Sequence, residues 1–128
     1  MLLRPSGLLV AAVMPVLPVL AACGARSSGD TTSVAGGDAE RGAAAIARYG
    51  CGACHEIPGV RTADGLVGPP LDRWRRRIYI AGRLPNTPEN MVQWVMQPQA
   101  FEPGGAMPNM GVREGDARDI AAYLYTLR

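Results

Sequence analysis

The chain has 128 residues, a formal net charge of +2 and 48% hydrophobic residues, which suits one small domain with a tail. The near-neutral charge excludes nucleic-acid binding driven by bulk electrostatics. Phenylalanine occurs once, and much of the hydrophobic content is alanine or lies near the N-terminus. A domain this small buries a modest share of its surface, so we expect a cofactor or another internal support to complete its core.

The first segment is predicted to be a secretory signal rather than part of the fold. Residues 1–22 carry one early charge, Arg4, followed by an apolar run that Pro15 and Pro18 interrupt. At about 16 residues, this run is shorter than the roughly 20 that a transmembrane helix needs. It ends in Leu-Ala-Ala-Cys, which resembles a bacterial lipobox and predicts lipidation of Cys23. The alternative is an ordinary signal peptide in which this cysteine is incidental.

The next segment, residues 23–37, is predicted to be a flexible linker behind the lipidated cysteine. Glycine, serine and threonine dominate it, and such a segment cannot bury enough apolar surface to order itself. The folded domain is therefore placed at residues 38–128.

Three main helices are predicted in this domain. The first covers residues 38–49, where Asp38 can cap the helix and alanines dominate. The second begins at Thr87, a capping residue, with Pro88 in the first helical position. We expect Pro98 to end this second helix.

The last helix is expected at residues 114–127, where apolar side chains recur with helical spacing. Its cap is weak because Arg113 holds the capping position. A short helix is also expected at residues 71–77. Strand signals are few, so the predicted class is all-α. The long loops between the helices make sense if they wrap around a large rigid ligand.

The segment 49–55 holds Cys51, Cys54 and the sole histidine, His55. A redox dithiol of the thioredoxin type would want a βαβ context, which is not predicted. A zinc site needs four ligands, and no further Cys or His follows. Cys-x-x-Cys-His is instead the signature of haem c attachment. Positions i, i+3 and i+4 share one helical face, so two thiols can bond two vinyl groups while the imidazole faces the iron. One covalent haem c is the predicted cofactor.

Methionine is the remaining side chain suited to the second axial position, because there is no second histidine. Met91 is expected in the core of its helix, and Met96 lies away from that face. Met107 and Met110 lie in the Gly/Pro-rich loop before the last helix, and the proline after Met107 stiffens the chain there. The residues alone do not decide between Met107 and Met110 as the axial ligand.

Further candidates for the haem pocket come from the segment 73–77 and its surroundings. Its arginines suit haem propionates, with Arg77 and Tyr79 as the favoured pair. The alternatives are a solvated face or a patch for an acidic partner. Trp94 is expected to pack against the haem as part of the pocket wall rather than to donate a hydrogen bond to the ligands.

The stretches Cys-Gly-Ala-Cys-His, Gly-Pro-Pro-Leu and Ala-Met-Pro-Asn-Met-Gly-Val, followed by the last helix, resemble class I mono-haem cytochromes c. The similarity is greatest to small bacterial cytochromes that serve respiratory chains and terminal oxidases. It covers the whole domain and implies a cytochrome c fold. It also implies that the methionine of the Met-Pro pair, Met107, binds the iron.

The same resemblance implies further contacts. In the Gly-Pro-Pro-Leu stretch, the carbonyl of Pro69 would accept the ring N–H of His55, which orients the imidazole, and Leu71 would belong to the haem pocket. The terminal helices would cross at Gly42 and Tyr123.

The predicted function is single-electron transfer by a lipid-anchored cytochrome on the periplasmic side of a bacterial membrane. The expected partners are a donor of the quinol–cytochrome c reductase type and an acceptor of the terminal-oxidase type. The protein is expected to be a carrier rather than an enzyme, with membership of an oxidase complex left open. The alternative is a haem enzyme subunit, or a gas or redox sensor, with a labile sixth ligand. No distal histidine or titratable cluster favours that alternative.

Overall fold

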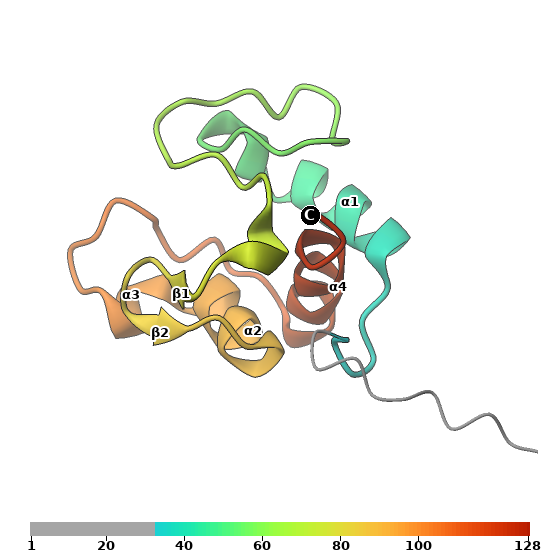
Figure 1. The fold of residues 1–128 in the computed structure, drawn as a ribbon. Helices are drawn as coiled ribbons and strands as arrows, with labels where there is room; N and C mark the ends of the chain where they lie inside the picture. The colour runs from blue at the N-terminus through green and yellow to red at the C-terminus, as the bar shows by residue number, and fades with distance from the viewer. Residues whose placement is uncertain (1–32) are drawn as a thin grey trace, which may run out of the picture.

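The computed structural model describes residues 33–128, so the predicted signal, Cys23 and most of the predicted linker lie outside the described residues. The elements in Figure 1 are, in chain order, α1 (Ala39–Arg48), η1 (Cys51–Ala53), η2 (Trp74–Arg76), β1 (Tyr79–Ile80), β2 (Leu84–Pro85), α2 (Pro88–Met96), α3 (Pro98–Phe101) and α4 (Glu114–Leu124). Helices α1, α2 and α4 fall where the sequence predicts them. Whether the whole has the cytochrome c fold stays a prediction.

Helix α1 begins and ends as its sequence predicts. The side chain of Asp38 caps it by accepting a hydrogen bond from a backbone N–H of the first turn. Its buried face is formed by Gly42, Ala45 and Ile46. Gly50 then follows with a φ of 70°, a left-handed conformation that glycine adopts without strain and that turns the chain out of the helix.

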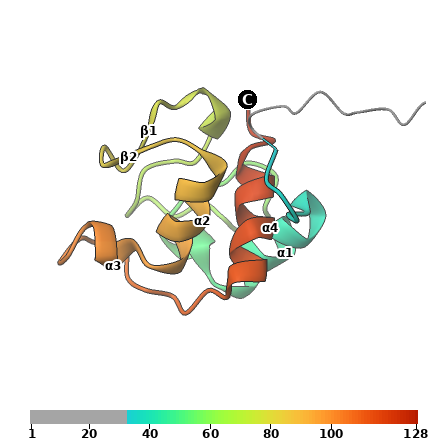
Figure 2. The same ribbon diagram turned by 90° about the horizontal axis from the view of Figure 1, so that it is seen from below.

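Helices α1 and α4 cross in direct contact, although they stand at opposite ends of the domain in sequence (Figures 1 and 2). A Cβ atom at Gly42 would lie 2.1 Å from the carbonyl oxygen of Asp119 and 2.8 Å from the Cβ of Tyr123. No side chain fits there, so a glycine is what allows the two backbones to meet. The expected contact between Gly42 and Tyr123 is therefore present.

An ion pair that the sequence did not indicate stands beside this crossing. Asp119 is buried in α4, and its carboxylate accepts hydrogen bonds from Arg41 Nε at 2.8 Å and from Arg41 Nη2 at 2.9 Å. It also accepts one from the backbone N–H of Asp38 at 2.8 Å. The hydrogen bond from Arg41 lowers the pKa of Asp119, against the opposing effect of burial. The helix crossing is thus held by backbone packing and by a charged pair.

Helix α2 also begins as predicted, with Thr87 accepting a hydrogen bond from the backbone N–H of Asn90 at 3.2 Å. Its face of Met91, Trp94 and Val95 is buried. The helix packs against α4, which places the core between α1, α2 and α4.

Helix α2 ends just before Pro98, as predicted, but the chain then forms a short helix that the sequence did not indicate. The helix ends at Met96, and Pro98 then begins the short helix α3 instead of simply breaking the chain. Proline lacks a backbone N–H and has a helical φ, so it suits the first turn of a new helix. A second difference is the antiparallel pairing of β1 with β2, in which Ile80 faces Leu84. At two residues each, these strands are too short to give an alternating pattern.

Two long segments without regular helices complete the domain, one between η1 and η2 and one between α3 and α4 (Figures 1 and 2). The segment expected as a short helix at residues 71–77 forms the single turn η2. Within residues 33–128, no helix is both long enough and apolar enough to cross a membrane.

Candidate functional site

A cavity of about 440 Å³ opens between the helices and the two long loops, and its walls are mainly apolar. The core residues Ile46, Ile80 and Leu124 form part of these walls and are almost wholly buried. Every sequence-predicted site residue in the described chain lines this one cavity: Cys51, Cys54, His55, Pro69, Leu71, Arg77, Tyr79, Trp94 and Met107. The structure therefore brings together residues from segments that are far apart in sequence.

The two thiols and the imidazole enter the cavity from one turn. Cys51 begins the 3-10 turn η1, Cys54 follows it, and the backbone N–H of His55 donates to the carbonyl of Cys51 at 3.0 Å. Both cysteines are free thiols. Cys51 is partly buried, and this burial raises the pKa of its thiol. Cys54 is exposed at the rim.

The ring of His55 is fixed by two neighbours. Its Nδ1 lies 2.8 Å from the carbonyl oxygen of Pro69, which is the contact that the sequence led us to expect. Because a carbonyl only accepts, Nδ1 carries the proton in this hydrogen bond, which makes Nε2 the nitrogen that has a lone pair whenever the ring is neutral. Gly68 packs against the ring, since a Cβ there would lie 2.3 Å from Cε1 of His55. The imidazole is thus oriented and prepared to bind a metal through Nε2.

Two methionines reach the same cavity from the loop between α3 and α4. Met107 is partly buried, and Met110 is 42% exposed. Met91 also lines the cavity, but from the buried face of α2, as predicted for a core residue. Met96 is not among the lining residues. The choice between Met107 and Met110 as a ligand stays a prediction.

Arg77 and Trp74 form a polar corner of the cavity. The Nη2 of Arg77 donates to the carbonyl of Pro70 and, at 3.3 Å, to that of Asp72. The guanidinium also lies 5.0 Å from the centre of the Trp74 ring, in a cation–π contact. These bonds hold the arginine against the wall, and Oδ1 of Asp72 lies 3.7 Å from the same Nη2 nitrogen as an ion-pair partner.

Trp74 is the functional candidate that sequence reasoning missed. Its side chain is buried, lines the cavity, and leaves the indole N–H without a hydrogen-bond partner. Such a donor is costly unless an acceptor satisfies it. The arginines of this stretch dominate its interpretation from sequence alone. A tryptophan among them was the one signal that could have indicated a buried residue of the cavity wall.

The remaining predicted residues form part of the cavity wall and have no proposed chemical role. Trp94 is buried and stacks at a tilt on Phe101, with ring centres 6.4 Å apart. Tyr79 is 57% exposed at the rim, on β1. The backbone N–H of Leu71 donates to the carbonyl of Glu56 at 2.8 Å, which ties the loop after Pro69 to the segment after His55.

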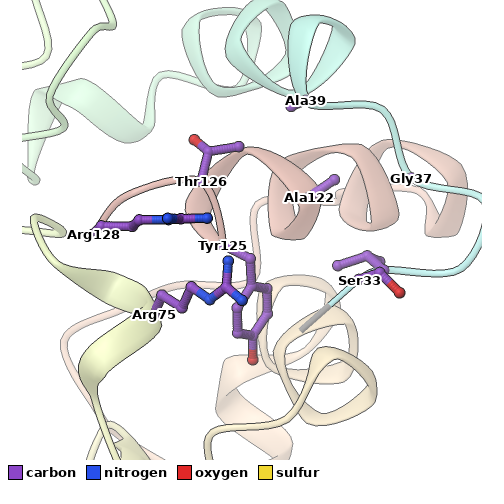
Figure 3. A pocket seen from close by; sticks show the side chains of 9 residues that line it. Ser33, Gly37, Ala39, Arg75, Ala122, Tyr125, Thr126 and Arg128 are labelled. Atoms are coloured by element: carbon purple, nitrogen blue, oxygen red, sulfur yellow. The ribbon is translucent and has the colours of Figure 1, made fainter. Parts of the chain in front are cut away.

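A second hollow of about 390 Å³ lies between the start of the described chain and its C-terminus (Figure 3). It is lined by Ser33, Val34, Gly37, Ala39, Arg75, Ala122, Tyr125, Thr126 and Arg128. These side chains include no thiol, imidazole or thioether. Within residues 33–128, no three or more His, Cys, Asp or Glu side chains group as a metal site would require. The first cavity is therefore the candidate site.

Comparison with known proteins gives one informative similarity. No family model matches the chain. Over 91 residues it is 33% identical to cytochrome c oxidase subunit 2 of Alkalihalophilus pseudofirmus. The matched region is 70% of this chain but 26% of that protein, so the chain spans about a quarter of the length of this relative. The similarity links most of the chain, though not the whole of the relative, to a subunit of a respiratory oxidase.

Proposed function

We propose that residues 38–128 form a mono-haem c-type cytochrome that transfers single electrons between respiratory-chain partners. The observation that carries the proposal is the convergence of Cys51, Cys54, His55 and Met107 on one apolar cavity. A bound haem would supply a centre that gains and loses one electron at a time.

The residues of the cavity fit such a group. The walls are apolar, as a porphyrin face requires, and His55 has a lone pair on Nε2 because Nδ1 is engaged by Pro69. A propionate carboxylate would lie near the charge of Arg77, which lines the cavity. The two thiols would form the thioethers, and Met107 would supply the second axial ligand.

The protein's own residues account for the remaining requirements of a carrier. Pro69 and Gly68 hold the His55 ring in one orientation, which limits rearrangement when the charge of the centre changes. Buried apolar side chains such as Ile46, Ile80 and Leu124 line the cavity interior. The similarity to an oxidase subunit supports a role in respiratory electron transfer.

For partners, we propose a quinol–cytochrome c reductase-type donor and a terminal-oxidase-type acceptor. The similarity to cytochrome c oxidase subunit 2 favours that acceptor and raises a second candidate, a fixed subunit of the oxidase. We propose further that Cys23 carries a lipid that tethers the domain on the periplasmic side of a membrane. Copurification of an oxidase with the chain after detergent extraction distinguishes the fixed subunit from the mobile carrier.

The haem proposal is tested by mass spectrometry on protein made in a host that attaches haem c. The denatured chain should have the mass of the polypeptide plus one haem, located on the peptide that contains Cys51 and Cys54. The double variant Cys51→Ser/Cys54→Ser should have the mass of the polypeptide alone. Haem that passes freely into acidified organic solvent from the wild-type protein would contradict covalent attachment.

A further inference from the structure

The loop that carries Met107 has little backbone support of its own. Residues 102–113 contain no helix and no strand, as the long trace from α3 to α4 in Figure 2 shows. Within the described part of the chain, no hydrogen bond between backbone groups involves residues 106–112. The conformation of this loop must therefore be set by side chains.

Gln99 supplies that support with its whole carboxamide. Its Nε2 donates to the carbonyl of Gly105 at 2.9 Å and to the carbonyl of Met107 at 2.6 Å. Its Oε1 accepts from the backbone N–H of Gly104 at 2.9 Å. A glutamine side chain has two N–H donors and one carbonyl acceptor, so both kinds of group are engaged by the same loop.

A further hydrogen bond joins the loop to Gln99, this time from the backbone of Gln99 to a side chain of the loop. The side-chain Oδ1 of Asn109 accepts from the backbone N–H of Gln99 at 3.2 Å. Gln99 is thus joined to the loop on both sides of Met107, at Gly104 and Gly105 before it and at Asn109 after it. This bracket restricts the position of the Met107 backbone from two directions.

The helix that carries Gln99 is itself anchored to the cavity wall. Pro98 is fully buried, and Phe101 packs on Trp94, which lines the cavity. The backbone N–H of Glu102 donates to the carbonyl of Pro98 at 2.9 Å and closes the turn. The glutamine therefore extends from a fixed support rather than from a mobile segment.

We infer that Gln99 is the positioning residue that holds Met107 in place as the second axial ligand. This inference rests on the proposed function and deepens it. Gln99 acts on the methionine through the loop backbone and does not itself bind the iron. Without its carboxamide, the loop would lose its main connection to α3, and the methionine would detach more readily.

The test compares three variants of the haem-loaded protein. Gln99→Ala removes all three side-chain hydrogen bonds. Gln99→Glu keeps the shape and the acceptor for Gly104 but places an oxygen opposite the carbonyls of Gly105 and Met107. Gln93→Ala is the matched control, because Gln93 is exposed on α2 and its side chain makes no hydrogen bond within residues 33–128.

Two readouts separate positioning from general stability. The first is the rate at which added imidazole displaces the methionine from the oxidised iron, followed by loss of the sulfur-to-iron charge-transfer band. The second is hydrogen exchange at the backbone N–H of Gly104. Both Gln99 variants should lose methionine about 10- to 100-fold faster, because Gln99→Glu removes two hydrogen bonds to the loop and Gln99→Ala removes all three. Gly104 should exchange faster in Gln99→Ala, and Gln93→Ala should match the wild type in both readouts.

The outcomes distinguish this inference from the proposed function. A wild-type protein with the charge-transfer band, and unchanged displacement rates in both Gln99 variants, overturns the inference alone. A wild-type protein that binds one haem but lacks the band overturns the assignment of Met107, and the inference with it. Equal acceleration by Gln93→Ala shows a general loss of stability and also overturns it.

Discussion

The hydroxyl of Tyr125 donates to Oδ1 of Asn86 at 2.8 Å, and Nδ2 of Asn86 donates in turn to the carbonyls of Trp74 and Arg77 at 3.0 and 2.9 Å. One amide thus connects the end of α4 to the segment that forms the polar corner of the cavity. The C-terminal helix therefore contributes to the position of Trp74 and Arg77, although it is remote from them in sequence.

Burial raises the pKa of Tyr125 to about 12, and the charge of Glu89 adds to this effect. An interaction of the Tyr125 hydroxyl with the indole N–H of Trp74 opposes these two effects and is the smallest of the three. The folded-state pKa lies above the value of about 10 for an unfolded tyrosine. The contribution of this raised pKa to the free energy of unfolding is therefore complete below about pH 10. It is lost as the pH rises through the folded-state pKa of Tyr125.

A spectrophotometric titration of phenolate should accordingly show one tyrosine that ionises near pH 12. In Tyr125→Phe this step should disappear, and stability should fall less steeply above about pH 10. At neutral pH the variant should lose about 0.5–1.5 kcal/mol for the hydrogen bond to Asn86. If the late step persists in Tyr125→Phe, the assignment is wrong.

The contact of Gly42 with Asp119 predicts a strong effect of a single methyl group. Gly42→Ala should destabilise the domain by about 1–3 kcal/mol, because the added Cβ would overlap the carbonyl oxygen 2.1 Å away and force the helices apart. The measurement is denaturant unfolding followed by circular dichroism. Gly115→Ala, in the first turn of α4, is the control, since nothing lies within 4 Å of its Cβ position. It should be neutral or stabilising by up to about 1 kcal/mol. Equal losses in both variants would refute the packing argument.

The assignment of the axial ligand predicts opposite results for two neighbouring methionines. Met107→Ala should abolish the sulfur-to-iron charge-transfer band of the oxidised protein and lower its reduction potential, because methionine ligation favours the reduced state. Met110→Ala should change neither, since that side chain is partly exposed at the rim. Visible spectroscopy and a redox titration measure both quantities. The reverse pattern would transfer the assignment to Met110.

Carrier function predicts that both axial positions are filled. The reduced protein should therefore bind carbon monoxide only slowly and incompletely at neutral pH. Met107→Ala should bind it rapidly, which provides a positive control in the same fold. Fast stoichiometric binding by the folded wild-type protein would favour a sensor or a haem enzyme with a labile ligand.

The proposed lipid anchor predicts that one substitution moves the protein from the membrane fraction of the cell to the soluble fraction. Wild-type chain should sediment with membranes and carry acyl groups at Cys23, whereas Cys23→Ser should be found in the soluble fraction. Cell fractionation and mass spectrometry of the N-terminal peptide measure this. An unmodified N-terminus on soluble wild-type protein would contradict the anchor.

Local signals made parts of the structure predictable. Asp38 and Thr87 act as caps because each needs only its own side chain and a backbone N–H three residues on. The spacing of Cys51, Cys54 and His55 is similarly local. The contact of His55 with Pro69 spans 14 positions, and it could be expected only through resemblance to a known family.

Other features depend on how distant segments meet, and their sequences carry no such signal. The burial of Asp119 follows from the approach of α1, which brings Arg41 to it across 78 positions. The unpaired indole of Trp74 becomes evident only when the walls of the cavity surround it. The support of Met107 by Gln99 requires α3, a helix of four residues that is too short for a periodic pattern.

The crossing of α1 and α4 also imposes an order of events on biosynthesis. Arg41 and Asp119 are 78 positions apart, so at about 5–20 residues per second α1 is made roughly 4–16 s before its partner. During this interval Ile120 and Leu124, which form part of the cavity wall, do not yet exist. Cys51 and Cys54 have already been made by then, so the segment that carries both thiols precedes the helix that completes the cavity wall.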